Sequence, residues 1–131
     1  MTVVSTTRDY MVSDVITVAA EMDIHHAIKV LFENGISGAP VLDDAGNLVG
    51  MLSTRDCLKV AFSAGYHRDS GGVVAEFMSP DVETVEVDTD IVKVAELFLK
   101  SRFRRFPVTS NDRLVGLISR SDVLKALEDL W

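Results

Sequence analysis

Cysteine is nearly missing from this sequence, since Cys57 is the single thiol among 131 residues. One cysteine excludes an internal disulfide framework and a zinc cluster of several cysteines. Long apolar runs are also missing: no uninterrupted stretch approaches the roughly 18 residues of a membrane-spanning helix. The first residues lack the basic-then-apolar layout of a signal peptide. We therefore expect a cytoplasmic protein in which Cys57 packs as a small hydrophobic residue.

Positive charge is scarce, because 13 Lys and Arg stand against 20 Asp and Glu, for a net charge of −7. A surface that follows nucleic-acid phosphates needs clustered basic side chains, so the composition argues against a nucleic-acid partner. A local exception is the group formed by Arg102, Arg104 and Arg105. These arginines are interpreted either as a solvated helix end or as a phosphate contact, and the composition slightly favours the solvated end.

Histidine is rare as well, with three residues in the chain. His25 and His26 are neighbours on a predicted helix, so their side chains point about 100° apart and cannot face one metal ion together. We predict that these histidines and His67 face solvent and that the chain holds no metal. No Ser/His/Asp or Cys/His grouping and no glycine-rich phosphate loop is present. The sequence therefore does not predict an enzyme.

The chain does contain an internal repeat, in which one sequence unit occurs twice. Residues 48–56 (LVGMLSTRD) return almost letter for letter as residues 114–122 (LVGLISRSD). Earlier in each copy, Met11 matches Met78 and Pro40 matches Pro107 at one constant offset. After the hairpin turn that follows these prolines, the offset drops by one. A unit of about 60 residues buries only about 60% of its surface and is marginal alone. We therefore expect each half to need the other.

Each copy has the pattern of a strand, a helix, two strands and a second helix. In the first copy, residues 14–18 are β-prone, and the apolar stripe over residues 24–32 predicts a helix capped by Asp23. Residues 39–42 and 48–53 flank a turn and predict an antiparallel hairpin, in which Pro40 should lie at the strand start or on an edge. Residues 65–72 have the composition of a linker. Two such units packed sheet against sheet about a pseudo-twofold axis leave two equivalent clefts.

The most informative motif is the Ser-x-x-Asp spacing at the end of the repeated strand. In each copy it predicts a capping box, where the side chains satisfy the free N–H groups of the first helical turn. A helix N-terminus also favours anions, and a carboxylate there can accept hydrogen bonds from a sugar diol. Both readings apply to Ser53 with Asp56 and to Ser119 with Asp122. Inside the same strands, Gly50 and Gly116 predict a close approach of other backbone.

These motifs occur twice, at matching positions of the repeat. In this arrangement they strongly resemble a tandem pair of CBS domains (a Bateman module) over about residues 8–130. The resemblance rests on residues 37–41 (SGAPV) with 50–56 (GMLSTRD), and on residues 104–108 (RRFPV) with 116–122 (GLISRSD). It implies an α+β fold of two βαββα repeats, packed sheet to sheet with pseudo-twofold symmetry. The expected divisions are CBS repeat 1 at 8–64, a linker at 65–73, and CBS repeat 2 at 74–131.

The resemblance also implies adenine nucleotide sites built across the two repeats, with no catalytic residues. In the first site, ribose and phosphate would be held by Ser119, Ser121 and Asp122, and adenine would face Ile16, Ile36, Ser37 and Gly38. In the second site, Ser53, Arg55 and Asp56 would lie opposite Glu83, Phe103, Arg104 and Arg105. Small residues line the first site, whereas Glu83 and the arginines depart from a small-residue cleft. The first site is therefore predicted to bind more tightly.

Two functions from different classes remain open. One is a regulatory module that binds AMP, ADP or ATP, with NAD or S-adenosylmethionine as further possible ligands, and acts on an unidentified regulated protein. The other is a structural dimerisation module of the same fold that binds no nucleotide. No required cofactor is expected. An apolar helix face that ends at Trp131, together with the resemblance, predicts a homodimer.

Overall fold

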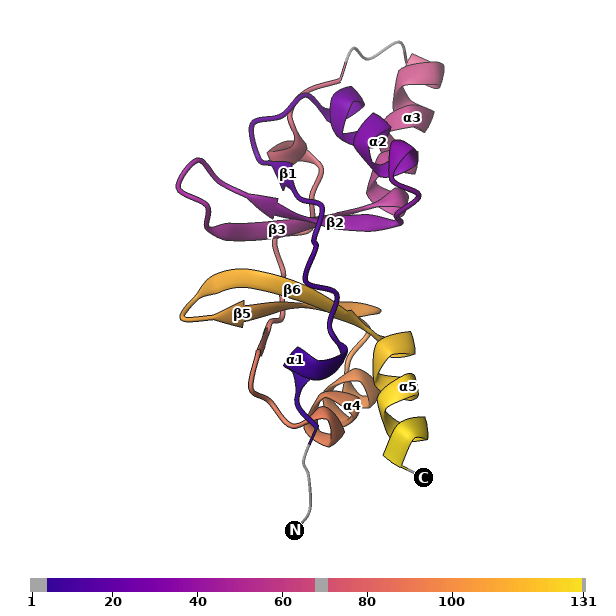
Figure 1. The fold of residues 1–131 in the computed structure, drawn as a ribbon. Coiled ribbons are helices and arrows are strands. Elements are labelled where there is room, and N and C mark those ends of the chain that lie inside the picture. The colour runs from indigo at the N-terminus through magenta and orange to yellow at the C-terminus, as the bar shows by residue number, and fades with distance from the viewer. Residues whose placement is uncertain (1–4, 68–70, 131) are drawn as a thin grey trace. The chain divides into compact units, whose positions relative to one another are not determined.

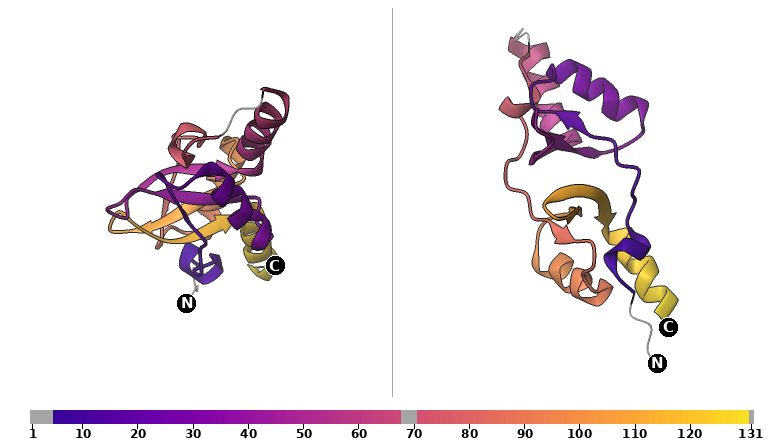
Figure 2. Two further views of the ribbon diagram at one scale, coloured as in Figure 1. Left: turned by 90° about the horizontal axis from the view of Figure 1, so that it is seen from above. Right: turned by 60° about the vertical axis from the view of Figure 1, so that its left-hand side comes forward.

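The computed structural model describes residues 5–67 and 71–130, which form two compact units. Unit 1 combines residues 1–15 with residues 83–131, and unit 2 spans residues 16–82. Each unit holds a three-stranded sheet with its main helices on one face (Figures 1 and 2). The predicted α+β class and the repeated βαββα order are confirmed. Trp131 lies outside the described residues.

Unit 2 contains the first βαββα set in chain order. Its β1 strand pairs parallel with β2, and β2 pairs antiparallel with β3, as the hairpin pattern predicted. A short 3-10 helix follows after the unit's second α-helix. The bounds are β1 (Val18–Ala19), α2 (Ile24–Glu33), β2 (Gly38–Leu42), β3 (Leu48–Ser53), α3 (Thr54–His67) and η1 (Val74–Glu76).

Unit 1 repeats this arrangement with the second set. Here β4 pairs parallel with β5, and β5 pairs antiparallel with β6. A four-residue helix near the N-terminus also belongs to unit 1. The bounds are α1 (Thr7–Tyr10), β4 (Val85–Glu86), α4 (Ile91–Lys100), β5 (Arg105–Ser110), β6 (Arg113–Ser119) and α5 (Arg120–Leu130).

The first helix of each set begins at an aspartate cap, which the sequence predicted for Asp23. The Asp23 carboxylate accepts hydrogen bonds from the N–H groups of His25 and His26 at 2.7 and 3.4 Å, and Asp90 accepts from the N–H of Val92 at 2.8 Å. Such caps satisfy N–H groups that lack a partner within the helix. Gly35 follows α2 with φ of +60°, a conformation that favours glycine at a helix end.

The core of each unit lies between its sheet and its two long helices. In unit 2, Leu31 from α2 and Leu52 from β3 are buried together with Cys57 from α3. In unit 1, Phe98 from α4 stacks on Phe106 from β5 with 4.2 Å between ring centroids. Cys57 is thus the small buried residue that its sequence context predicted, and burial raises the pKa of its thiol.

Two short segments pack on the edge strands of the sheets, and we call them the N-terminal strap (residues 6–12) and the central strap (residues 73–79). The N-terminal strap lies at the start of the first repeat in sequence but belongs to unit 1, where Val12 exchanges two backbone hydrogen bonds with Leu117 of β6. The central strap belongs to unit 2, where Ser79 exchanges two with Met51 of β3. The compact units therefore cut across the sequence repeats.

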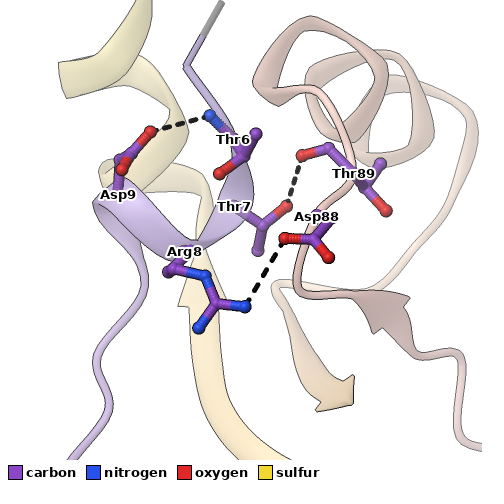
Figure 3. A network of polar contacts seen from close by, with 6 residues as sticks. All are labelled: Thr6, Thr7, Arg8, Asp9, Asp88 and Thr89. Carbon is purple, nitrogen blue, oxygen red and sulfur yellow. Dashed lines mark hydrogen bonds and ion pairs between the residues drawn. The ribbon is translucent and has the colours of Figure 1, made fainter. Parts of the chain in front are cut away.

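Polar contacts anchor the N-terminal strap to unit 1, as Figure 3 shows. The buried Thr7 donates from both its N–H and its hydroxyl to the carbonyl of Thr89, each at 2.9 Å. Arg8 forms an exposed ion pair with Asp88 at 3.5 Å. An exposed pair contributes little, so the buried threonine is the stronger anchor.

Three local expectations differ from the structure. The β-prone run 14–18 becomes a strand only at Val18, and α3 continues to His67, past the expected start of the linker. Pro40 lies in the middle of β2, the central strand of its sheet, and not at a strand start or edge. It is tolerated because it faces Met51, whose N–H and C=O bond to Ser79 of the central strap instead of to β2.

Candidate functional site

The Ser53–Asp56 motif joins β3 to α3 in unit 2. The Asp56 Oδ2 atom accepts hydrogen bonds from the N–H and the hydroxyl of Ser53, both at 2.9 Å. In return, Ser53 Oγ accepts from the N–H of Asp56 at 3.2 Å. This reciprocal pair is the predicted capping box, and it fixes the carboxylate at the first turn of a 14-residue helix.

The Ser119–Asp122 motif repeats this geometry at the junction of β6 and α5 in unit 1. Asp122 Oδ2 accepts from the N–H and the hydroxyl of Ser119 at 2.8 and 2.9 Å. The N–H of Asp122 donates to Ser119 Oγ at 3.3 Å. The sequence repeat is therefore also a repeat of the hydrogen-bonding pattern.

Each capping aspartate keeps one carboxylate oxygen available for a ligand. Oδ1 of Asp56 and of Asp122 accepts no hydrogen bond from the described residues, while Oδ2 carries the capping box. Both side chains are half-buried. An ionised carboxylate forms hydrogen bonds roughly twice as strong as neutral ones. Such an oxygen, oriented by the cap, can accept from a sugar hydroxyl while the helix N-terminus favours an anion nearby.

In unit 2 the residues next to the Ser53–Asp56 motif are small. Gly38 is the register partner of Ser53, and the carbonyl of Ser37 accepts from the N–H of Thr54 at 2.9 Å. Ile36 is half-buried just before β2, and Ile16 is half-buried two residues before β1. The end of the hairpin in this unit thus combines the exposed Ser37 with the buried Gly38.

In unit 1 the equivalent positions are basic and aromatic. Arg105 is the register partner of Ser119, and the carbonyl of Arg104 accepts from the N–H of Arg120 at 3.4 Å. The Arg120 guanidinium donates to the carbonyl of Phe103 at 3.2 Å. Burial, and then the neighbouring Arg104 charge, lower the pKa of Arg105. Positive charge is thus concentrated at this end of unit 1.

Arg120 was not among the predicted site residues, although it lies inside the repeated motif at the position of Thr54. Its role depends on its contact with the backbone before β5, which the linear motif does not contain. Arg102, in contrast, lies with its guanidinium carbon 5.6 Å from the centroid of the Phe103 ring. Glu83 is exposed two residues before β4.

The predicted sites draw on residues from both units. Within one unit, the structure places Ser37 and Gly38 beside the Ser53–Asp56 motif, and Arg104 and Arg105 beside the Ser119–Asp122 motif. The family resemblance pairs each motif with the hairpin end of the other repeat. That pairing stays a prediction.

Metal-ligand clusters and membrane-spanning helices are both absent from the described part of the chain. No group of three His, Cys, Asp or Glu side chains there could hold a metal ion. His25 and His26 are exposed, whereas the side chain of His67 lies outside the described residues. None of the described helices has the length and apolar character needed to span a membrane.

Comparison with known proteins identifies the repeat. The family model described as "CBS domain" matches residues 8–63 and 74–129. The structure of CBSX2 from Arabidopsis thaliana in complex with AMP has a TM-score of 0.82 at 30% identity, covering 95% of this chain and 97% of that chain. The CBS domain pair of protein MJ0100, in complex with 5-methylthioadenosine and S-adenosyl-L-methionine, has a TM-score of 0.78 at 25% identity, covering 94% and 99%.

Curated relatives are longer than this chain. The uncharacterized protein MJ1225 of Methanocaldococcus jannaschii is 30% identical over 124 residues, which cover 95% of this chain and 43% of that protein. The chloroplastic CBS domain-containing protein CBSX1 of Arabidopsis thaliana is 30% identical over 129 residues, which cover 79% of this chain and 55% of that protein. The chain thus spans about half the length of these two relatives. The two family matches cover most of the sequence, so the chain belongs to the CBS-domain family and carries two copies of that domain.

Proposed function

We propose that this chain is a regulatory module that binds an adenine nucleotide and passes the resulting change to a regulated protein. The observation that carries the proposal is the oriented carboxylate of each Ser-x-x-Asp motif, whose Oδ1 is available at a helix N-terminus. The AMP complex of CBSX2, a protein of the same fold, supports the choice of ligand class. The motif acts in recognition, and the chain itself is proposed not to catalyse a reaction.

The proposed primary site uses the Asp122 carboxylate for the ribose. Two adjacent ribose hydroxyls can both donate to one ionised carboxylate, and Ser119 and Ser121 lie beside it for the phosphate. The adenine ring is proposed to face the small hairpin end of the other repeat. That end comprises Ile16, Ile36, Ser37 and Gly38. A glycine and exposed backbone let a purine approach N–H and C=O groups closely.

The proposed secondary site uses Asp56, with Ser53 and Arg55, and the hairpin end of unit 1. There Arg104 and Arg105 replace the small residues, and Glu83 replaces Ile16. Bulk at this end weakens binding of AMP. Guanidinium groups bind phosphate oxygens well, so this site is proposed to favour ADP or ATP over AMP.

The ligand range follows the same chemistry. AMP, ADP and ATP share the diol and the adenine edge, and so do NAD and S-adenosylmethionine, so all five belong in one screen. No resident cofactor or metal is part of the proposal. We place the module in the cytoplasm, where these ligands are abundant, and we leave the regulated protein unidentified.

Calorimetry and thermal unfolding with the intact chain test the proposal. A ligand at one hundred times its Kd stabilises the folded state by about 2.7 kcal/mol, which raises the melting temperature measurably. The matched control is 2′-deoxy-AMP, which lacks one hydroxyl of the diol. It should bind about tenfold to a hundredfold more weakly than AMP, because a hydrogen bond to a charged group contributes about 1.5–3 kcal/mol. Equal binding of both would refute the carboxylate–ribose contact.

A second candidate function is dimerisation without a ligand. It is favoured by large apolar side chains that the helices leave exposed at equivalent positions of both repeats. Phe32 on α2 is 77% exposed, and its counterpart Leu99 on α4 is 89% exposed. Exposed apolar groups of this size commonly mark contact surfaces. A chain that dimerises but shows no response to any of the five ligands would support this function instead.

A further inference from the structure

The loop that leads from α4 into β5 carries the basic residues of the proposed secondary site. It begins at Ser101, directly after α4, and ends at Arg105, the first residue of β5. We call residues 103–105 the basic wall. Arg104 is exposed and Arg105 is half-buried. The position of both side chains depends on how the loop is held, because a segment with few hydrogen bonds opens easily.

The equivalent loop of unit 2 is closed by its own backbone. Gly35 follows α2 with φ of +60°, and the N–H of Ile36 donates to the carbonyl of Leu31 at 3.1 Å. A glycine in the left-handed conformation, followed by such a hydrogen bond, is a common end of a helix. This closure uses only residues of the helix and the loop.

The loop of unit 1 lacks this glycine, because Arg102 stands at the position of Gly35. A side chain makes the left-handed conformation unfavourable, and Arg102 does not have a positive φ. The N–H of Phe103, which matches that of Ile36 in the repeat, donates to Ser101 Oγ at 3.2 Å instead. The helix end and the basic wall are therefore not joined as they are in unit 2.

Arg120, the first residue of α5, holds this loop from outside. Its guanidinium Nη2 donates to the carbonyl of Phe103 at 3.2 Å, and its N–H donates to the carbonyl of Arg104 at 3.4 Å. The two hydrogen bonds act on consecutive peptide groups of the basic wall. In unit 2, the N–H of Thr54 makes the equivalent backbone bond to Ser37 at 2.9 Å. A threonine side chain is too short to repeat the guanidinium bond, so that bond distinguishes unit 1.

Aromatic contacts hold the other side of the same residue. The Phe103 ring lies 6.2 Å from the ring of the buried Phe106, measured between centroids. The core contact fixes the side chain of Phe103, whereas Arg120 fixes its carbonyl. Together they determine the direction in which the chain continues into Arg104 and Arg105.

We propose that Arg120 is a positioning residue, which holds the basic wall so that Arg104 and Arg105 can receive the second and third phosphates of ADP or ATP. It acts through the wall and does not touch the nucleotide. Arginines that are held in place lose less conformational entropy when they bind phosphate. The inference rests on the proposed function and adds the residue that sets the nucleotide preference of the secondary site.

The alternative is that Arg120 attracts the nucleotide through its charge alone. Arg113 provides the matched control, because it is an exposed arginine at the opposite end of β6. Arg113→Ala removes the same charge from the same unit and leaves both hydrogen bonds of Arg120 to the loop in place.

Calorimetry of the intact chain with ATP and with AMP distinguishes these roles. Arg120→Ala should weaken ATP binding at the secondary site about threefold to tenfold, the loss expected for one exposed hydrogen bond. AMP binding at the primary site should not change. Arg120→Lys keeps a donor of similar reach and should recover most of the ATP affinity, and Arg113→Ala should bind ATP like the parent. An unchanged ATP affinity in Arg120→Ala, or an equal loss in Arg113→Ala, would overturn the positioning role.

Amide hydrogen exchange, followed by NMR without nucleotide, tests the contact independently of the ligand. In Arg120→Ala the amides of residues 103–105 should exchange faster, while residues 36–38 of the other repeat keep the rates of the parent. Unchanged exchange at residues 103–105 would overturn the hold on the loop, whether or not a nucleotide binds. If exchange is faster but the parent binds no adenine nucleotide, the proposed function fails, and with it the role in nucleotide choice, whereas the hold on the loop stands.

Discussion

The sulfur of Met78 lies 2.5 Å from the position that a Cβ atom on Gly50 would occupy. The carbonyl oxygen of Ser79 lies 2.9 Å from the same position. Gly116 has the same relationship to Met11, at 2.6 Å, and to the carbonyl of Val12, at 2.9 Å. Each strap thus crosses its β-strand at the one residue without a side chain. The repeated glycine is explained by this close approach.

We expect Gly50→Ala and Gly116→Ala each to lower the free energy of unfolding by about 1–3 kcal/mol, the usual cost of overpacking a filled site. The methionine can move, but the backbone carbonyl cannot move without disturbing the strap. Urea unfolding followed by circular dichroism measures the change. Adding Met78→Ala to Gly50→Ala should restore only part of the loss. An unchanged unfolding midpoint for Gly50→Ala would contradict the assigned crossing.

A second prediction concerns where the chain can be divided. Residues 1–68 form a complete sequence repeat but lack the central strap, which covers β3 in unit 2. Residues 16–82 match the compact unit and include that strap. We expect the fragment 16–82 to give the better-dispersed amide NMR spectrum, although a unit of this size is only marginally stable.

The complementary experiment mixes the fragments 1–68 and 69–131. Each carries the strap that packs on the other's sheet, so the mixture should recover structure that neither fragment has alone. A sharp, dispersed spectrum from residues 1–68 by themselves would show that the strap exchange is not needed for folding.

The sequence predicts the local structure well because local chemistry determines it. Asp23 caps α2, the hairpin is antiparallel, and the Ser53–Asp56 pair forms a capping box, since each of these depends on residues a few positions apart. The strap exchange could not be predicted in this way. Met11 and Met78 occupy the same place in the repeat, and either could cover either glycine. Only the path of the whole chain decides which sheet receives which strap.

The expectations from the sequence that the structure contradicts have a related cause. Pro40 was expected at an edge because proline cannot donate a ladder hydrogen bond, but the strap at Ser79 takes the hydrogen bonds of the residue opposite it. Leu58 and Phe62 lie on an apolar stripe, yet they are 68% and 63% exposed. An amphipathic pattern shows which face is apolar and not what covers it.

A third prediction concerns the turn between β5 and β6. Asn111 and Asp112 both have positive φ, at 52° and 66°, as in a type I′ hairpin turn, where glycine is preferred at the second position. A left-handed conformation costs most residues about 1–2 kcal/mol. Asp112→Gly should therefore raise the free energy of unfolding by about 0.5–1 kcal/mol, less than the full amount because glycine also gains freedom in the unfolded chain. Asn111→Ala is the opposite control and should destabilise the protein. Reduced stability of Asp112→Gly in urea would contradict this account.

The fourth prediction tests the ligand assignment. Asp122→Ala should weaken AMP binding about tenfold to a hundredfold in calorimetry, because it removes a charged partner of the ribose that contributes about 1.5–3 kcal/mol. Asp56→Ala is the matched control from the other repeat and should leave the high-affinity AMP signal nearly intact. The difference is expected because the wall proposed for the Asp122 site contains Ser37 and Gly38, whereas the other contains Arg104 and Arg105.

Both aspartates cap helices, so each alanine variant is also expected to lose about 1 kcal/mol of stability. Urea unfolding must therefore confirm that each variant is folded at the temperature of the titration. Asp122→Asn separates the two roles, because its amide oxygen can still accept from the N–H of Ser119 while the charge offered to the ribose is gone. It should keep most of the stability and still bind AMP weakly. A folded Asp122→Ala protein that binds AMP like the parent would show that this carboxylate is only a helix cap.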